Sequence, residues 1–370
     1  MSVYASITDV GEKIKNDFRS SGDKKGLSLL YAFNATGKTR LSVELDQLNE
    51  NEDGQIKVLS YNALLEDLFT WNNEDFELNF DPNSWVSRLA AEQGIENNIA
   101  NNFKSLLHSN IEPVFDFSKG RVTFNISSGD DSSVNCIKIS RGEESVFVWS
   151  IFYSFLETAI DALNTDEESR ATTAFNHLEY VVIDDPVSSI DDSRIIAIAV
   201  GLFEIIRTSK NPSLSFFITT HHALFYNVLY NSFGRLKKTE IKSLFYILSK
   251  NRDNTLELRE QGSDTPFAYH LLVKDQIWDV IESGDIEKYH YNLFRGLLEK
   301  TASFLGYRNW SDCVTGTSKE EFIRTVNLYS HSKLSELESG LMSDSDKQIF
   351  VETFRKFVED FHFQNSNHVG

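Results

Sequence analysis

Residues 27–39 read LSLLYAFNATGKT, an apolar run of strand type that passes into a glycine-containing turn and then into a helical pattern. In such a loop the backbone N–H groups surround the phosphates of a nucleotide, the lysine neutralises them and the last hydroxyl binds Mg²⁺. We assign these roles to Lys38 and Thr39. The other expected nucleotide contacts of this stretch are Asn34, Thr36, Gly37 and Arg40.

Two alanines separate this loop from the usual pattern of the motif. Ala32 stands where the motif has its first glycine, and Ala35 stands where many such loops have a second one. Glycine adopts a positive φ without cost and alanine does not. The loop must therefore either avoid left-handed backbone at these positions or hold it under strain, and the nucleotide preference of the site stays open.

Residues 180–185, YVVIDD, have the pattern of a strand buried on both faces that ends in two carboxylates. In an ATPase the first carboxylate assists Mg²⁺ and the second orients or deprotonates the attacking water. We assign these roles to Asp184 and Asp185. Because aspartate is one methylene shorter than the glutamate usual at the second position, we expect slow hydrolysis. The alternative interpretation is a strand that closes on a polar turn.

Further segments follow in the order found in ABC-type ATPases. Residues 139–143, ISRGE, resemble the signature sequence of that class, in which a serine hydroxyl, a glycine backbone and a helix N-terminus bind the γ-phosphate. Residues 185–191 resemble the D-loop, and a histidine follows a strand as the switch histidine does. The residues expected to contact nucleotide here are Ser140, Gly142, Glu143, Asp185, Asp191 and His221.

Two positions in this set are open. His222 could take the role of its neighbour His221, and Asn62 is only a candidate where a glutamine is usual. The order of the segments still predicts an α/β head of the ABC-type P-loop ATPase class. In that class the signature of one subunit closes on the nucleotide of another. We therefore expect a homodimer or a higher homo-oligomer, formed through the heads, whose nucleotide state controls the rest of the chain.

The character of the sequence changes near residue 262. Strand-like runs precede it, at residues 56–61, 122–126, 214–218, 244–248 and 255–258, and they alternate with helical patterns. Beyond it the periodicity is helical, and Gly, Ser, Asp and Pro at residues 262–266 favour a linker. We expect an ATPase domain over residues 1–262 and a mostly α-helical domain over residues 263–370.

Composition limits the function classes. The chain of 370 residues has a net charge of −19, which argues against a nonspecific nucleic-acid coat, because such proteins bind phosphates through clustered Lys and Arg.

The longest apolar runs, residues 146–156 and 195–202, are shorter than the roughly 18–20 residues of a membrane span. Residues 1–18 lack the apolar core of a secretory signal. Two cysteines are too few for a disulfide framework. We expect a cytoplasmic protein that does not enter a membrane.

One charged pair is conspicuous in the helical part. Arg295 and Glu299 lie four residues apart and therefore on neighbouring turns of one helix face. The simplest interpretation is a solvated ion pair. Arginine before glutamate is the less favourable order relative to the helix dipole, so a purely stabilising role is weakened but not excluded.

Across both domains, in order and over nearly its whole length, the chain resembles the PrrC-type anticodon nucleases. The motifs that carry the resemblance are YAFN at 31–34, ISRGEES at 139–145, DDPVSS at 184–189, FYNVL at 225–229, EKTASFLGY at 299–307 and SHS at 330–332. The resemblance implies cleavage of transfer RNA, typically lysine tRNA, on the 5′ side of the wobble base, with 2′,3′-cyclic phosphate and 5′-hydroxyl ends. It also implies latency held by a type I restriction–modification complex, release during phage infection, GTP hydrolysis and dTTP binding.

The resemblance extends to three catalytic residues, because Arg295, Glu299 and His331 match the family's Arg, Glu and His. Cleavage of RNA through its own 2′-OH needs a base, an acid and positive charge near the phosphorane, and no metal. We assign Glu299 as base, His331 as acid and Arg295 as stabiliser, although the sequence leaves open which of Glu299 and His331 is the acid. Arg324 has the Arg-to-His spacing of HEPN-type RNases and is a second candidate cation, or an ordinary exposed arginine.

Recognition of the RNA is expected before the helical part. Residues 259–270 match the part of the family thought to read the modified wobble base. Asp264 could pair there with a cationic modification.

Two other functions fit the head motifs. A DNA-repair ATPase of the SMC or RecF kind would use the helices as a non-catalytic module, but residues 40–138 lack the sustained heptads that such proteins usually insert. The nucleotide-binding subunit of a membrane transporter is disfavoured by the divergent D-loop and the helical tail.

Overall fold

The computed structural model describes residues 2–19, 25–33, 36–46, 56–62, 65, 67–127, 133–134, 136–188, 190–236, 241–251, 253–261, 269–331 and 342–363. The chain divides into two units, Met1–Phe267 and Ala268–Gly370, which are called the head and the helical unit below. The expected boundary between residues 262 and 263 falls in a segment outside the described residues.

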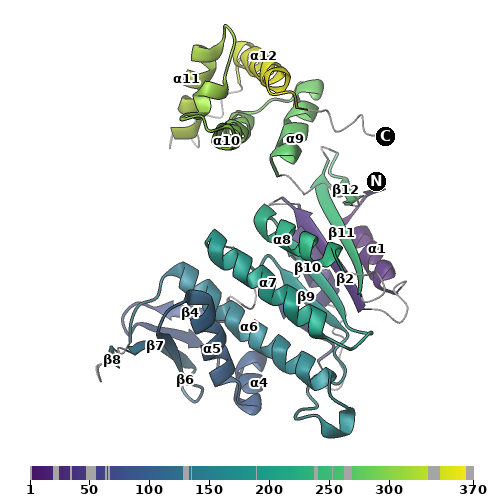
Figure 1. Cartoon of the computed structure of the whole chain (residues 1–370), viewed down its shortest axis with the longest axis vertical. Helices are drawn as coiled ribbons and strands as arrows, with labels where there is room; N and C mark the ends of the chain where they lie inside the picture. Colours follow the sequence, from purple (N-terminus) through teal and green to yellow (C-terminus); the bar gives the residue numbers. More distant parts are fainter. Residues whose placement is uncertain are drawn as a thin grey trace. The chain divides into compact units, whose positions relative to one another are not determined.

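A seven-stranded sheet forms the centre of the head (Figure 1). Its strands lie in the order β1 (Ser2–Tyr4), β12 (Leu256–Glu260), β11 (Ile241–Lys250), β2 (Lys25–Ala32), β10 (Ser215–Thr220), β9 (Tyr180–Asp184) and β3 (Val58–Tyr61). The five strands from β11 to β3 are parallel, and β1 and β12 add an antiparallel edge. The carboxyl ends of β2, β9 and β10 therefore meet at one edge of the sheet.

Helices cover both faces of this sheet, which explains why every residue of β2 and β10 is buried. Leu30 and Ala32 of β2 pack with residues of α1 (Ile7–Arg19) and α2 (Lys38–Asp46). Tyr31 points to the opposite face, where its ring centroid is 5.8 Å from that of Tyr226 in α8 (Ala223–Gly234). This alternation is the one expected for a strand buried on both sides. Helix α7 (Asp192–Thr208) packs against α8.

A second, antiparallel sheet lies in the head between β3 and the signature segment, where we expected one strand at residues 122–126. It contains β4 (Phe69–Asn72), β5 (Glu77–Phe80), β7 (Arg121–Ser127) and β6 (Ile111–Asp116) in that order, with β8 (Ser133–Val134) paired to β7. Helices α4 (Trp85–Gln93) and α5 (Glu96–Leu107) connect β5 to β6.

Helix α6 (Arg141–Leu163) is long and apolar enough, by length and composition alone, to cross a membrane. The apolar runs counted from the sequence did not single out this helix, because the run within α6, residues 146–156, is shorter than a membrane span. Within the fold 72% of its most apolar window is buried. Phe147 of α6 lies 5.5 Å from Phe103 of α5 and 5.1 Å from Phe124 of β7, measured between ring centroids. Packing inside the head therefore accounts for the apolar sequence.

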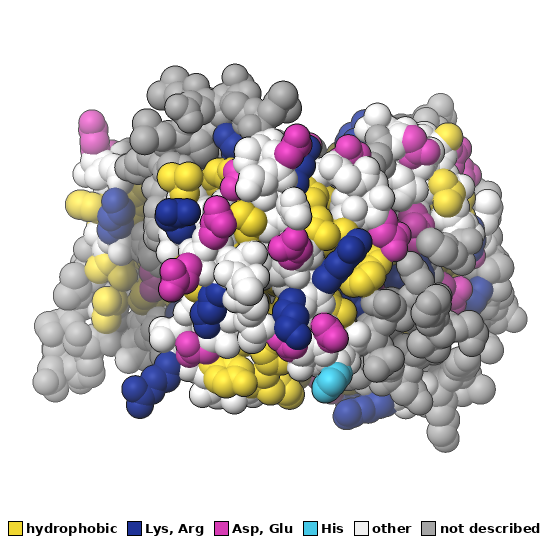
Figure 2. All heavy atoms as spheres, turned by 90° about the horizontal axis from the view of Figure 1, so that it is seen from above, with side chains coloured by type: hydrophobic (Ala, Val, Ile, Leu, Met, Phe, Trp, Pro, Cys, Tyr) yellow, Lys and Arg dark blue, Asp and Glu magenta, His cyan; other side chains and the backbone are white. Residues whose placement is uncertain are grey.

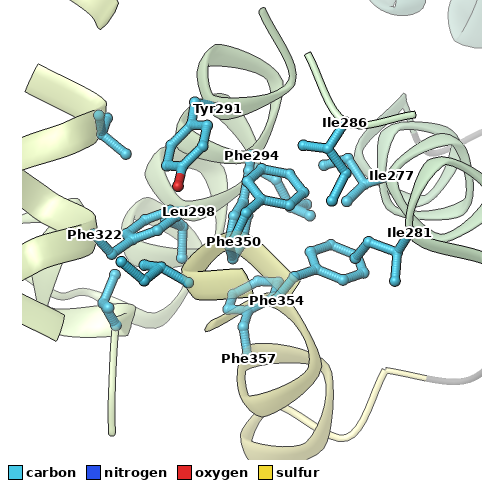
Figure 3. Packing of buried hydrophobic residues seen from close by; sticks show 14 of the residues in the cluster. Ile277, Ile281, Ile286, Tyr291, Phe294, Leu298, Phe322, Phe350, Phe354 and Phe357 are labelled. Atoms are coloured by element: carbon cyan, nitrogen blue, oxygen red, sulfur yellow. The ribbon is translucent and has the colours of Figure 1, made fainter. Parts of the chain in front are cut away.

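The described part of the helical unit contains no strand. It consists of α9 (Tyr269–Ser283), α10 (Lys288–Leu305), a short 3-10 helix η3 (Trp310–Cys313), α11 (Lys319–His331) and α12 (Asp344–Asp360). Aromatic residues fill its core (Figure 3). The ring of Phe294 in α10 lies 5.2 Å from Phe322 in α11 and 5.1 Å from Phe354 in α12. These contacts bury one face of α10 and leave the face with Arg295 at the surface.

Candidate functional site

The predicted phosphate-binding loop lies between β2 and α2. Gly37 has a φ of 103°, a conformation that favours glycine. Ala32 ends β2 as an ordinary strand residue, so the loop avoids left-handed backbone at the first of the two alanines. Ala35 and the predicted contact Asn34 lie outside the described residues. The hydroxyl of Thr36 donates to the carbonyl of Phe33 at 2.7 Å, which tightens the turn before α2.

Lys38 projects from the start of α2 toward the ends of the neighbouring strands. Its Nζ donates to the carbonyl oxygens of Ala32 and Phe33, each at 3.2 Å, and lies 3.9 Å from Oδ2 of Asp185. The side chain is only 7% exposed, and this burial lowers the pKa of Lys38 although two nearby carboxylates oppose the change. The ammonium group therefore lies where the loop would hold a phosphate.

The two carboxylates after β9 have different surroundings. Asp184 is 5% exposed, and burial raises its pKa, while hydrogen bonds from Thr219 and Thr39 act in the opposite direction. A carboxylate beside the hydroxyl of Thr39 is a donor set that suits Mg²⁺, which prefers oxygen ligands. The two residues proposed to hold the metal therefore meet. Thr219, which fixes Asp184 from the adjacent strand, was not predicted from the sequence.

Asp185 follows the end of β9 with a backbone φ of 53°, which is uncommon for a residue other than glycine. Its Oδ1 accepts from the backbone N–H of His221 at 3.2 Å, and its Oδ2 contacts Nδ1 of the same histidine. Burial favours a higher pKa for Asp185, but the hydrogen bonds and charges of His221 and Lys38 hold the pKa below its usual range. The structure thus brings together Lys38, Asp185 and His221 at one edge of the sheet.

We expect Asp185→Asn to lower nucleotide hydrolysis by about 100-fold, because an amide cannot take a proton from water. Nucleotide affinity should be kept, since Lys38 and Gly37 are unchanged. Phosphate release measures the rate, and titration with a fluorescent nucleotide measures the affinity. Asp161→Asn, which removes an exposed carboxylate of α6, is the control. Hydrolysis at the wild-type rate in Asp185→Asn would contradict the assignment.

The signature segment starts α6. Ser140 is its N-cap and forms a capping box with Glu143, in which the serine hydroxyl accepts from the backbone of Glu143 at 3.3 Å and Glu143 accepts from the backbone of Ser140 at 2.6 Å. Both side chains therefore stabilise the helix start. Ser140 is exposed and Gly142 is partly exposed, so this helix end is accessible in a single chain.

The four remaining candidates for the nucleotide site lie at or near the ends of helices and strands. Asp191 caps α7, accepting from the backbone of Arg194 at 3.1 Å and pairing with its guanidinium at 2.9 Å. His222 precedes α8, and burial lowers its pKa. Asn62 is buried after β3, where its side chain accepts from the backbone of Leu65 at 3.2 Å. Arg40 is exposed on α2.

The charged pair of the helical unit is formed and has a third member. Nε of Arg295 donates to Oε1 of Glu299 at 2.9 Å, and the two side chains are 25% and 50% exposed. The guanidinium carbon of Arg295 also lies 5.5 Å from the ring centroid of Trp310, a cation–π contact. Trp310 was missed in the sequence because it belongs to η3, and no helical spacing relates it to Arg295.

His331 is the last residue of α11, and its side chain lies outside the described part of the structure. Tyr329 of α11 contacts Tyr291 in the first turn of α10, with ring centroids 5.3 Å apart. The end of α11 therefore lies beside the start of α10, and Glu299 is about 12 Å further along α10 than Tyr291. The structure brings Arg295 and Glu299 together, while the inclusion of His331 in their site stays a prediction.

The roles expected for Arg324 and Asp264 also remain predictions. Arg324 is a highly exposed residue of α11 whose guanidinium lies 3.9 Å from Glu321, in keeping with an ordinary surface pair. Asp264, predicted to contact the anticodon, lies outside the described residues.

Known proteins resemble both units of the chain. Residues 83–359 match the AAA_13 family, described as an AAA domain. Over 334 residues the chain is 40% identical to an Escherichia coli protein named "Anticodon nuclease", and the match covers 84% of this chain and 82% of that protein. This chain belongs to the anticodon nuclease family. Membership of that family confirms the resemblance to PrrC-type proteins drawn from the sequence motifs.

Solved structures similar to this anticodon nuclease family member include heads of SMC proteins. The SMC head domain from Thermotoga maritima is 10% identical, with a TM-score of 0.33 over 65% of this chain and 92% of that one. An SMC head bound to the C-winged helix domain of ScpA is 11% identical, with a TM-score of 0.31 over 63% of this chain and 55% of that one. The assignment of the head as a P-loop ATPase rests on the sheet order, the phosphate-binding loop and the AAA match.

Proposed function

We propose that this chain is a nucleotide-regulated endoribonuclease that cuts transfer RNA in the anticodon loop. Its identity of 40% to an anticodon nuclease, over most of both proteins, carries the proposal. The chain also holds an ATPase head and a separate helical unit with a surface Arg–Glu pair. We infer that lysine tRNA is the substrate and that the cut lies on the 5′ side of the wobble base.

The cleavage chemistry is assigned to the helical unit, which we propose to be HEPN-like. Glu299 takes the proton from the 2′-OH, His331 gives a proton to the leaving 5′-oxygen, and Arg295 stabilises the charge that develops on the phosphorane. The acid and base roles of Glu299 and His331 could be exchanged. The products carry a 2′,3′-cyclic phosphate and a 5′-hydroxyl, and the reaction needs no metal at this site.

The RNA must bind through a local surface. Figure 2 shows Lys and Arg side chains interspersed with Asp and Glu over the described residues of one face. A net charge of −19 agrees with this mixture. Long-range attraction to phosphate is therefore weak, and contacts close to the cut must supply much of the affinity. We infer that Asp264 contributes to recognition of the wobble base.

The head is proposed to control the nuclease through bound nucleotide. Lys38 and the loop residues bind the phosphates of ATP or GTP, or those of dTTP as a regulator. Thr39 and Asp184 would hold Mg²⁺, which would neutralise charge at the phosphates. Asp185 orients or deprotonates the attacking water, and His221 donates a hydrogen bond to the γ-phosphate. Ser140, Gly142 and Asp191 belong to the surface that closes on the nucleotide of a second head, so the active form is a homodimer or a higher oligomer.

The proposed setting is antiphage defence in the cytoplasm, with no membrane partner. A type I restriction–modification complex keeps the nuclease latent, and its disturbance during infection releases the activity. The ATPase domain is proposed to span residues 1–262 and the nuclease domain residues 263–370.

Expression of the chain without its partners, followed by mapping of RNA ends, tests this function. We expect a single class of new ends in the anticodon loop of lysine tRNA, with a 5′-hydroxyl on the downstream fragment. Total tRNA incubated with the purified protein should give the same ends. Intact tRNA under every nucleotide condition, with the restriction complex absent, would refute the proposal and favour an SMC- or RecF-like ATPase.

A further inference from the structure

Arg295 is held from two sides. Glu299, one turn further along α10, accepts a hydrogen bond from its Nε at 2.9 Å. Trp310 of η3 offers its ring to the guanidinium, 5.5 Å from centroid to carbon. A surface arginine has several rotatable bonds and normally samples many rotamers. Two contacts from different elements restrict this one to a small part of that range.

These two contacts leave the terminal nitrogens of the Arg295 guanidinium accessible. Among the described residues, the side chain of Arg295 donates through Nε to Glu299, and its guanidinium carbon lies over the ring of Trp310. The two terminal nitrogens are therefore available for oxygens of a phosphate, which arginine binds with a pair of parallel hydrogen bonds.

We propose that Trp310 is a positioning residue for Arg295 in RNA cleavage. This inference rests on the proposed function, in which Arg295 stabilises the phosphorane. The indole, together with Glu299, limits the positions open to the guanidinium, so that its terminal nitrogens meet the phosphate without first losing rotamer freedom. Trp310 itself does not touch the reacting atoms.

The position of Trp310 is fixed by its own surroundings. The backbone N–H of Asn309 donates to Asp312 at 3.2 Å, and this pair forms a capping box around the single turn of η3. Cys313, the last residue of that turn, is fully buried. The ring of Trp310 packs against the helical core. The indole is therefore anchored independently of Arg295, as a positioning residue must be.

Two substitutions separate positioning from packing. Trp310→Phe keeps an aromatic face, and Trp310→Leu keeps apolar bulk without one. We expect kcat for tRNA cleavage to fall about tenfold in Trp310→Leu and by less than about threefold in Trp310→Phe, with KM for tRNA nearly unchanged in both. Trp278→Leu is the matched control, because Trp278 packs against the same core and its Nε1 donates to Glu282 at 2.8 Å. It should keep the wild-type kcat.

The same substitution in an Arg295→Lys protein tests whether the loss of kcat in Trp310→Leu depends on Arg295. Lysine keeps the charge of Arg295 but lacks the planar group that the ring orients. In Arg295→Lys, we expect Trp310→Leu to lower kcat by clearly less than in the wild type. The proposal is overturned if the loss is equal in both backgrounds, if Trp310→Phe loses as much as Trp310→Leu, or if Trp310→Leu keeps the wild-type kcat. Thermal unfolding of each variant verifies the fold.

These outcomes differ from a failure of the proposed function. If the wild-type protein does not cut tRNA, the function itself fails. If the wild type cuts tRNA and Trp310→Leu does so at the same rate, only the role of Trp310 fails.

Discussion

Lys38→Ala is expected to lower the affinity for nucleoside triphosphate by about 100-fold. The ammonium group is the positive charge that lies above the phosphate-binding loop, within 3.2 Å of two of its carbonyl oxygens. Its removal takes this charge from the phosphates and leaves the other contacts of the proposed site in place. Titration with a fluorescent nucleotide in the presence of Mg²⁺ measures the change.

Lys104→Ala is the control for loss of a lysine charge, because Lys104 pairs with Glu112 at 3.0 Å near the second sheet. It should bind nucleotide as the wild type does. In Lys38→Ala the nuclease residues stay in place, so tRNA cleavage should no longer respond to added nucleotide. An affinity equal to that of the wild type would contradict the assignment of the phosphate-binding loop.

The strands and the helix around the proposed nucleotide site were predictable because their sequence signals are local. An apolar run that ends in a glycine turn specifies β2 and the start of α2, and a second run that ends in two carboxylates specifies β9. Parallel strands place their carboxyl ends together, so residues that follow β2 and β9 lie near each other. Nζ of Lys38 is accordingly 3.9 Å from Oδ2 of Asp185.

The second sheet was not predictable in the same way. Its strands are short and only partly buried, so the apolar alternation is weak. Pro113 lies inside β6, where a proline argues against a strand, but β6 pairs only with β7 among the described strands and therefore tolerates it as an edge. Tertiary pairing outweighed the local pattern there.

The surroundings of the Arg–Glu pair depended on contacts between elements. Spacing alone placed Arg295 and Glu299 on one helix face, and the ion pair at 2.9 Å agrees with it. The turn after Gly306, with a φ of 77°, leads the chain to η3, where Trp310 lies against the guanidinium. No periodicity links residues on the two sides of such a turn, so the tertiary fold was needed to find this contact.

Glu299→Gln is expected to lower the rate of tRNA cleavage by about 10²–10⁴-fold, the usual contribution of a general base. Glutamine keeps the size of the side chain, and its carbonyl oxygen can still accept from Nε of Arg295 at the position of Oε1. It cannot take a proton from the 2′-OH. A large loss in this variant therefore reports proton transfer and not the loss of the partner that orients Arg295. Single-turnover cleavage of lysine tRNA, followed on a gel, measures the rate.

Glu321→Gln is the matched control for Glu299→Gln. Glu321 and Arg324 both belong to α11, the helix next to α10, and form an exposed ion pair there. It should cut tRNA at the wild-type rate, since such pairs contribute little. Arg295→Ala and Arg324→Ala then compare the two candidate cations: loss in the first and not in the second assigns the phosphorane contact to α10. Cleavage by Glu299→Gln within about threefold of the wild type would mean that Glu299 orients Arg295 and that another group is the base.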